Sequence, residues 1–460
     1  MDGFVKKRAS IFFVFLLYLL FLFPISAFAQ ENEPVVDTGD TTWLLVAAAI
    51  VIFMHVPGLA LFYGGLVSER NVVSTMMHSF VSLLTVTIVW VLWGYSLSFG
   101  QDVGGIIGKL DYLAFNGVGG EAAFGSLTIP HYIFAIFQGA FAAITVAIIS
   151  GGIAGRISFP AWVMFSVLWI TFVYAPMAHW VWGGGWLFAM GELDFAGGTV
   201  VHILSGVSAL TAALVIGPRY EHMKKNDAPH NIVLFLIGAA TLWFGWFGFN
   251  AGSALSANGI TALAFANTQV AAAAGGLGWL IIEWMVRKRP TLVGTATGAI
   301  GGLVGITPAA GFVTIPSALI IGLASAPICY FAIHFVKARL KYDDTLDAFG
   351  VHGICGIWGS IATGLFATKS VNPAGNNGLF YGNPEQLFHQ VIGVIVAVLL
   401  AAVGTYIVLK IVSLFTPLRV KKEDELLGLD LSFHQEPAYS DVDQSIEEKG
   451  KSNDIASQMS

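Results

Sequence analysis

Two stretches of this chain carry an aspartate followed by a histidine inside otherwise apolar sequence. The first, 194–202, reads DFAGGTVVH from Asp194 to His202, and the second, 347–352, reads DAFGVH from Asp347 to His352. A charged side chain in the middle of a membrane helix costs at least about 2.5 kcal/mol on insertion scales, so ionisable residues there indicate a functional site. These two stretches are therefore the candidate site, and the rest of the chain must position them.

The aspartates and the histidines suit different tasks. An aspartate at a helix start accepts hydrogen bonds from free backbone N–H groups, so we predict that Asp194 and Asp347 are structural supports rather than solute ligands. His202 and His352 follow well inside their helices. Taken alone, each histidine is equally consistent with a role in a pore and with a hydrogen-bonding role between helices. A pair of imidazoles can share a proton, which suits a small nitrogenous solute better than a bulk ion.

The composition is that of a polytopic membrane protein. Of the 460 residues, 56% are hydrophobic and 11% are charged, and the mean hydropathy is +0.75. Soluble domains carry about 25% charged residues. The net charge of -6 lies mostly in the ends and loops and says little about partners. Cys329 and Cys355 fall in apolar segments, and we interpret them as small buried hydrophobic residues with no disulfide or metal role.

The first 29 residues have the features of a signal peptide. A basic start with Lys6, Lys7 and Arg8 precedes the apolar run 11–24, and the small-residue ending AFA occupies 27–29. This pattern predicts removal of 1–29 and an N-terminus outside the cell. The alternative is an additional, uncleaved first helix.

Long apolar runs predict an all-α fold with eleven transmembrane helices in residues 30–415. We place the spans at 43–67, 74–99, 131–154, 160–183, 198–217, 231–252, 264–286, 291–312, 315–336, 347–369 and 386–415. Basic residues gather on alternate connections, among them Arg70, Arg156, Arg219 and the cluster 287–289. Because positive charge stays inside, this pattern also places the N-terminus outside and the tail, 416–460, in the cytoplasm.

The eleven spans divide into five, five and one. The first span carries LFYGGL at 61–66 and the sixth carries WFGFNAGS at 246–253, while the fifth and tenth carry the two aspartate-to-histidine stretches. Similar features five spans apart, in halves with an odd number of helices, predict an inverted repeat with the site near the membrane midplane. The eleventh helix would be an outer brace.

Other chemistry is poorly supported. There is no H-E-x-x-H and no G-x-S-x-G motif, and the two histidines lack a third ligand nearby in the sequence. We therefore expect no metal, no cofactor, no catalytic residue and no nucleic-acid partner. An aromatic face beside a hydroxyl can attract a small cation with about 2 kcal/mol once water is excluded, and several aromatic residues lie near glycine turns.

These motifs together resemble the ammonium transporter family. The resemblance rests on DFAGGT at 194–199 continuing to IGPR at 216–219, and on LFYGGLV at 61–67, WVWGGG at 180–185, WFGFNAGS at 246–253 and FGVHG at 349–353. It extends in order from about residue 41 to residue 439. It implies a homotrimer in the cell membrane, eleven helices per subunit and one pore through each subunit.

The resemblance also implies roles for individual residues. Phe141, Trp182 and Ser253 would form the outer ammonium recruitment site, and Phe141 and Phe249 a stacked gate beneath it. His202 and His352 would be a twin-histidine pair in an apolar pore, with Trp246 beside them. Asp194 would hold the top of the fifth helix without lining the conduction path.

The tail resembles the family's cytoplasmic docking tail from Gly428 to Tyr439, with Gln435 where glycine is usual. The partner that this implies is a PII-type signalling protein. Two alternative functions stay open. The first is a Rhesus-type ammonia gas channel, against which DFAGG and Trp182 argue. The second is an ammonium sensor that signals through its tail, although this tail is only about 45 residues long.

Overall fold

The computed structural model describes residues 35–222 and 228–439. The predicted signal peptide, 1–29, and the end of the predicted tail, 440–460, lie outside these ranges. Within them the chain is helical apart from one short antiparallel pair, β1 (Asp102–Val103) with β2 (Ile107–Gly108). In the described residues, ten helices are long and apolar enough to cross a membrane. The eighth predicted span is the 15-residue apolar helix α13 (Leu292–Ile306), which buried turns extend to residue 313.

Four of the first five spans contain a π-helical segment, and the third span, α6 (His131–Ile153), is a continuous α-helix. The five spans are α2 (Thr38–Phe53), η1 (Met54–Leu59) and α3 (Ala60–Leu66); η2 (Glu69–Asn71), α4 (Val72–Val89), η3 (Trp90–Gly94) and α5 (Tyr95–Phe99); α6; α7 (Phe159–Trp169), η6 (Ile170–Tyr174) and α8 (Ala175–Val181); and η7 (Gly198–Ile203) with α10 (Leu204–Ile216). Short helices η4 (Leu110–Phe115), η5 (Ala123–Gly125) and α9 (Trp186–Met190) lie in the connections.

The second five spans, the brace and the tail follow. They are α11 (Ile232–Gly252); α12 (Gly259–Arg287); α13; α14 (Ile315–Phe331), η8 (Ala332–Val336) and α15 (Lys337–Leu340); η9 (Phe349–Ile354) with α16 (Cys355–Phe366); η10 (Leu379–Tyr381); α17 (Pro384–Ser413); and α18 (Lys422–Leu427) with η11 (Asp430–His434). The predicted eleven-helix, all-α fold is confirmed, with two five-helix repeats and an outer eleventh helix.

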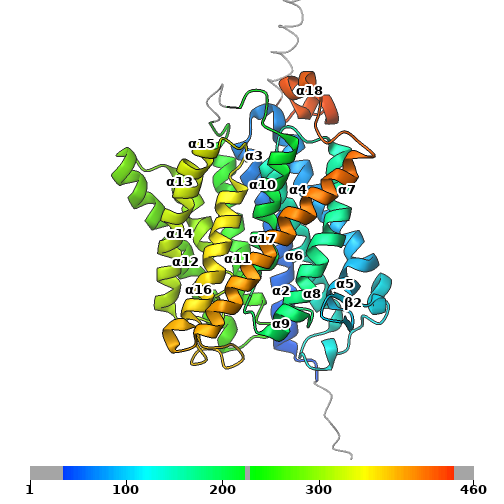
Figure 1. Cartoon of the computed structure of the whole chain (residues 1–460), viewed down its shortest axis with the longest axis vertical. Helices are drawn as coiled ribbons and strands as arrows, with labels where there is room; N and C mark the ends of the chain where they lie inside the picture. The colour runs from blue at the N-terminus through cyan, green and yellow to red at the C-terminus, as the bar shows by residue number, and fades with distance from the viewer. Residues whose placement is uncertain (1–34, 223–227, 440–460) are drawn as a thin grey trace, which may run out of the picture. The chain divides into compact units, whose positions relative to one another are not determined.

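Burial separates the central helix from the brace. In the most apolar window of α6, 83% of the residues are buried, against 33% for α17. Figure 1 shows α17 crossing the bundle obliquely. The figure also shows α18 beyond the end of the bundle where α3 and α15 finish, and α9 and β2 at the opposite end. We call these the tail-side end and the outer end.

The fifth and tenth spans are built alike and pack on each other reciprocally. Both begin with a six-residue π-helical segment that ends near its histidine, η7 in one and η9 in the other. The segment η7 packs on α16, while η9 packs on α10. Their backbones nearly touch, because a Cβ on Gly206 would lie only 2.1 Å from the nitrogen of Gly353. Glycine at this crossing lets the two histidine-bearing segments meet at one place.

Candidate functional site

Asp194 organises the start of the fifth span. Its Oδ1 accepts hydrogen bonds from the nitrogens of Gly197 and Gly198, at 2.8 and 2.6 Å. Its Oδ2 accepts from the nitrogens of Thr199 and Val200 and from the Thr199 hydroxyl, at 2.8, 3.2 and 2.6 Å. Both oxygens are thus fully occupied by the free N–H groups of a helix start. Asp194 supports the site and has little capacity left for a solute.

The tenth span starts differently from the prediction. The carboxylate that accepts hydrogen bonds at this helix start is Asp344, which receives the nitrogens of Ala348 and Phe349 at 3.1 and 2.8 Å. Asp347 has a left-handed backbone (φ 59°), and its side chain pairs with Lys337 at 2.6 Å instead. The expectation that Asp347 caps this helix is therefore wrong. It supports the helix start by an ion pair with the preceding span.

Burial dominates the electrostatics of Asp344. Removal from water raises the pKa of this carboxyl group to about 6, although the charge of Lys337 and the two backbone N–H groups oppose the rise. Its neighbour Asp343 behaves in the opposite way. Burial would raise the pKa of Asp343, but hydrogen bonds from Arg219 and the charge of Arg156 outweigh it and hold the pKa well below its usual range. Adjacent acids thus have different protonation behaviour at this end of the tenth span.

His202 and His352 meet in the interior. The Nδ1 atom of His352 lies 3.3 Å from the Nδ1 atom of His202, and the ring centroids are 5.3 Å apart. Both side chains are buried, and the sequence separates them by 150 residues. One of the two Nδ1 atoms must carry the hydrogen and the other must accept it.

Thr307 determines which of the two Nδ1 atoms carries the hydrogen. Sequence reasoning did not identify this role. The Thr307 hydroxyl donates to the Leu303 carbonyl at 2.8 Å, and its oxygen accepts from the indole N–H of Trp246 at 2.9 Å. The Nε2 atom of His202 lies 3.3 Å from the same oxygen and must donate to it. His202 Nδ1 is then the acceptor and His352 Nδ1 the donor, so His352 Nε2 is left with a free lone pair.

Aromatic rings close the outer side of the histidine pair. Phe141 of α6 stacks on Phe249 of α11 with centroids 4.1 Å apart and planes 20° apart. The Phe249 ring is also 5.9 Å from His202, and the Trp246 ring stacks on His202 at 5.5 Å. The rings of Phe141 and Phe249 are buried, so a solute must displace them to reach the histidines.

An outer vestibule lies above this stack. It is a cavity of about 630 Å³ whose wall includes Phe141, Trp182, Ser253 and Asp194. The Trp182 indole donates to the Asp194 carbonyl at 2.8 Å, which fixes the ring, and the Trp182 and Phe141 ring centroids are 6.0 Å apart with their planes at 85°. Ser253 donates to the Phe249 carbonyl at 2.9 Å, so its oxygen lone pairs remain available as acceptors. The three residues predicted for recruitment thus share one cavity.

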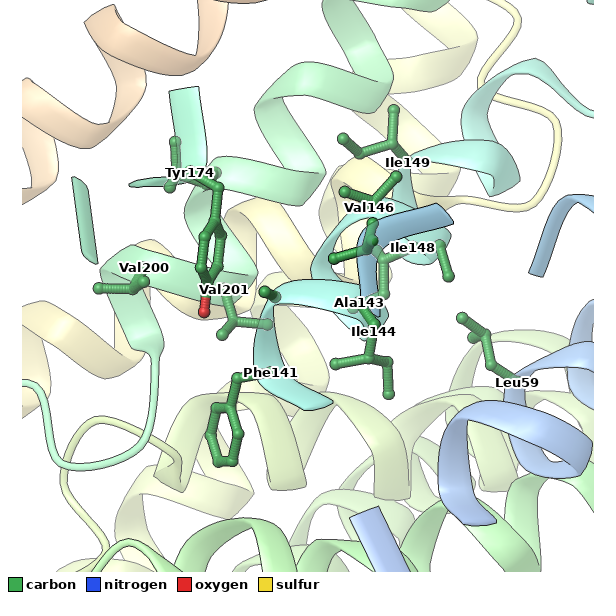
Figure 2. Close-up of a cluster of buried hydrophobic side chains, with 14 of the residues drawn as sticks. Leu59, Phe141, Ala143, Ile144, Val146, Ile148, Ile149, Tyr174, Val200 and Val201 are labelled. Carbon is green, nitrogen blue, oxygen red and sulfur yellow. The ribbon is translucent and has the colours of Figure 1, made fainter. Parts of the chain in front are cut away.

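The space below the stack is narrow and apolar. This lumen has a volume of about 10 Å³, about the room that one water-sized molecule needs. Besides the two histidines, its wall includes Leu59, Ile144, Ile148 and Val201, which Figure 2 shows around α6. A full charge in such surroundings lacks the hydration that it has in water.

The tail folds back onto the tail-side end of the bundle. Asp430 accepts from the nitrogens of Val73 and Ser74, at 3.1 and 2.8 Å, near the start of α4. Leu429 donates to the Asn71 side chain at 2.9 Å, and the Tyr439 hydroxyl contacts His230 at 3.0 Å. Gln435 has φ 52°, a left-handed conformation that favours glycine. The described part of the tail is therefore docked.

Comparison with known proteins gives a consistent result. The family model described as the Ammonium Transporter Family matches residues 42–439. An "Ammonium transporter" of Bacillus subtilis (strain 168) is 52% identical over 403 residues, which cover 88% of this chain and 99% of that protein. The "Ammonium transporter Amt1" of Archaeoglobus fulgidus is 46% identical and covers 87% of this chain and 99% of its own.

Solved structures agree with the sequence relatives. The crystal structure of Saccharomyces cerevisiae Mep2 is 36% identical, with a TM-score of 0.78, and covers 85% of this chain and 89% of its own. The solved structure of a "Sensor Amt Protein" is 32% identical, with a TM-score of 0.80, and covers 86% of this chain and 98% of its own. Since the match runs through every span that positions the histidines, the chain belongs to the Ammonium Transporter Family and is a multi-pass membrane protein that transports ammonium.

Proposed function

We propose that the protein recruits ammonium as a cation in the vestibule and passes it through the lumen as ammonia. The observation that carries this proposal is the position of Phe249. Its ring stacks on Phe141, which lines the vestibule, and also contacts His202, which lines the lumen. The vestibule, the stacked rings and the histidine pair therefore follow one another without a gap.

Recruitment requires a cation site that is open to water. Trp182 and Phe141 present ring systems, which attract a cation by about 2 kcal/mol when desolvated. Ser253 adds a hydroxyl oxygen that can accept an N–H of ammonium. Potassium has a similar size but donates no hydrogen bond, so the hydroxyl favours ammonium.

The lumen then selects by charge rather than by width. An ion that keeps its charge must leave its hydration shell to enter a dry lumen, which is costly. Ammonium can lose a proton and enter as neutral ammonia, whereas potassium cannot. In the lumen the free Nε2 lone pair of His352 and the ring edges offer hydrogen-bonding partners to ammonia. His202 and His352 are the residues that we assign to this step, and Trp246 orients His202 through Thr307.

We further propose the cellular arrangement. The outer end would face the cell exterior and the tail-side end the cytoplasm of a cell-membrane homotrimer, because most basic residues of the connections lie on the tail side. Residues 1–29 would be a signal peptide, 30–415 the transport domain and 416–460 the tail. The docked tail leaves a PII-type signalling protein as the candidate regulatory partner.

The test uses purified protein in liposomes. We would record the current and the internal pH after an ammonium pulse, with a potassium pulse as control. Either an ammonium-dependent current or internal alkalinisation, and no response to potassium, is the expected result. Substitution His352→Ala should change the flux or admit potassium. His334→Ala, which alters a histidine of η8 that does not line the lumen, should leave both unchanged.

The results separate the alternatives. A current with ammonium alone means net charge movement, and alkalinisation without current means a neutral ammonia channel of the Rhesus type. A folded protein that gives neither signal would contradict the proposal and favour an ammonium sensor. That second function is worth testing because one of the similar solved structures is that of a "Sensor Amt Protein".

A further inference from the structure

The vestibule wall contains a second acid that the proposed pathway does not use. Glu192 lies two residues before Asp194 and is 5% exposed. Among the described carboxylates it is the one whose two oxygens are both buried without a hydrogen-bond partner. A buried carboxylate without partners is strongly unfavourable, so this position needs an explanation.

The backbone around Glu192 is held firmly from α17. The Gln390 side chain accepts from the Leu193 nitrogen and donates to the Leu193 carbonyl, both at 2.8 Å. Gln386 donates to the Gly191 carbonyl at 2.9 Å. The carboxyl group itself rests on Gly393, where an added Cβ would lie 2.3 Å from Oε1. The backbone on both sides of Glu192 is therefore held in place, while the two carboxyl oxygens lie buried against α17 and make no hydrogen bond in the described structure.

The two acids of the vestibule have different roles. Asp194 uses all of its acceptor capacity on the helix start, including the hydroxyl proton of Thr199. Burial raises the pKa of Glu192 well above its usual range, and the charge of Asp194 adds to the rise. The Thr199 hydroxyl opposes it only weakly, since its one proton goes to Asp194. Burial and the charge of Asp194 both favour the protonated, neutral form of Glu192.

The other titratable groups around this position are limited. From α17, His389 approaches Gly191 and lies 3.7 Å from Glu385. The groups that shift the pKa of Glu192 include no cation. A cation that enters the vestibule would therefore be the nearest source of compensating positive charge.

We propose that Glu192 is a proton-exchanging residue of the transport pathway. When an ammonium ion occupies the vestibule, its charge favours the carboxylate, and the Glu192 side chain turns from Gly393 toward the vestibule and releases its proton to the water there. One N–H bond of ammonium then breaks, directly or through one water, and the proton forms a new O–H bond on Glu192. The electron pair stays on nitrogen, and ammonia leaves for the lumen. The balance is one ammonium consumed, one ammonia passed on and one proton released outside.

This inference rests on the proposed passage as ammonia, and one set of liposomes tests both. We would compare wild type, Glu192→Gln and Glu385→Gln, the last altering an exposed carboxylate of α17. In Glu192→Gln the maximal ammonium flux should fall at least about tenfold with little change in the half-saturating concentration, because vestibule water replaces a positioned acceptor poorly. Its dependence on external pH should also become flatter.

A spectroscopic readout separates proton exchange from a structural role. Infrared difference spectra recorded on addition of ammonium should show the band of a protonated carboxyl group decreasing in wild type and in Glu385→Gln. The band should be absent in Glu192→Gln. Equal flux, equal pH profile or an unchanged band would overturn the role of Glu192. Absence of ammonium transport in wild type itself would instead overturn the proposed function.

Discussion

His202 and His352 face each other through the same ring atom, Nδ1 to Nδ1 at 3.3 Å, from two spans that belong to different repeats. The contact depends on the crossing of the two backbones at Gly206 and Gly353. An added Cβ on Gly206 would lie 2.1 Å from the Gly353 nitrogen and 2.5 Å from its Cα. These are backbone atoms, which cannot turn away as a side chain would.

Replacing Gly206 should therefore disrupt the histidine pair without touching either histidine. In Gly206→Ala the spans must separate, and overpacking of this kind costs about 1 to 3 kcal/mol. We expect most of the ammonium flux into liposomes to be lost from a protein that still folds. Gly259→Ala is the control, because an added Cβ there meets nothing within 4 Å. Wild-type flux in Gly206→Ala would show that the contact is dispensable.

Thr307 should control the protonation pattern of the histidines. In Thr307→Val the indole N–H of Trp246 and the Nε2 hydrogen of His202 lose their common acceptor, and each unpaired buried group costs about 1 to 3 kcal/mol. We expect lower flux in Thr307→Val and near-normal flux in Thr307→Ser. Nitrogen NMR of labelled histidine should find His202 protonated at Nε2 in wild type and in Thr307→Ser. The same tautomer in Thr307→Val would refute the assignment.

Much of the fold could be predicted because membrane helices must satisfy their backbone internally and bury apolar length. Runs of about 20 apolar residues therefore located the spans, and the matching stretches at His202 and His352 indicated the repeat. Prediction was poorer for side chains whose partners come from another span. The sequence places Asp343, Asp344 and Asp347 within five residues of each other. It could not show that Lys337 attracts Asp347 and leaves the helix start to Asp344.

The missed residues share a physical reason. Thr307 lies in a turn after α13, far from both histidines in sequence, and only packing brings its hydroxyl to His202. Glu192 is one of several acids in the connections between spans, and its burial against Gly393 depends on where α17 crosses. A threonine at the end of an apolar run and an acid in a loop are common. Such roles become visible only with the tertiary contacts.

Asp344 should make stability depend on pH. Its folded pKa of about 6 lies above the unfolded value of about 3.9, so the folded state binds more protons. Its contribution is therefore fully present below about pH 4 and is lost as the pH rises through 6, by about 3 kcal/mol at most. Asp344→Asn removes this ionisation while keeping one acceptor oxygen for the helix start.

The measurement is the thermal unfolding temperature in detergent between pH 5 and pH 8. We expect the difference between Asp344→Asn and wild type to grow in favour of the variant as the pH rises. Glu423→Gln, an exposed substitution on α18, should follow wild type. A constant difference across this range would mean that Asp344 does not titrate there.

Gly428 should control the docking of the tail. Its φ of 111° is a conformation that side chains rarely adopt, and an added Cβ would lie 2.6 Å from the Arg70 Cβ and 2.7 Å from the Arg70 carbonyl oxygen. Gly428→Ala should therefore break two contacts. Leu429 would no longer donate to the Asn71 side chain, and Asp430 would no longer accept from the backbone nitrogen of Ser74 in α4. Arg70 also donates to the Leu426 carbonyl at 2.6 Å, so displacing Arg70 should loosen this contact too, and we expect the stretch around Gly428 to be released from the bundle. Limited trypsin digestion should then cut at Lys421 and Lys422 severalfold faster than in wild type.

Gly120→Ala, in an outer connection with nothing within 4 Å of the added Cβ, should be cut at the wild-type rate. Equal cleavage of Gly428→Ala and wild type would mean that the tail stays docked without this turn.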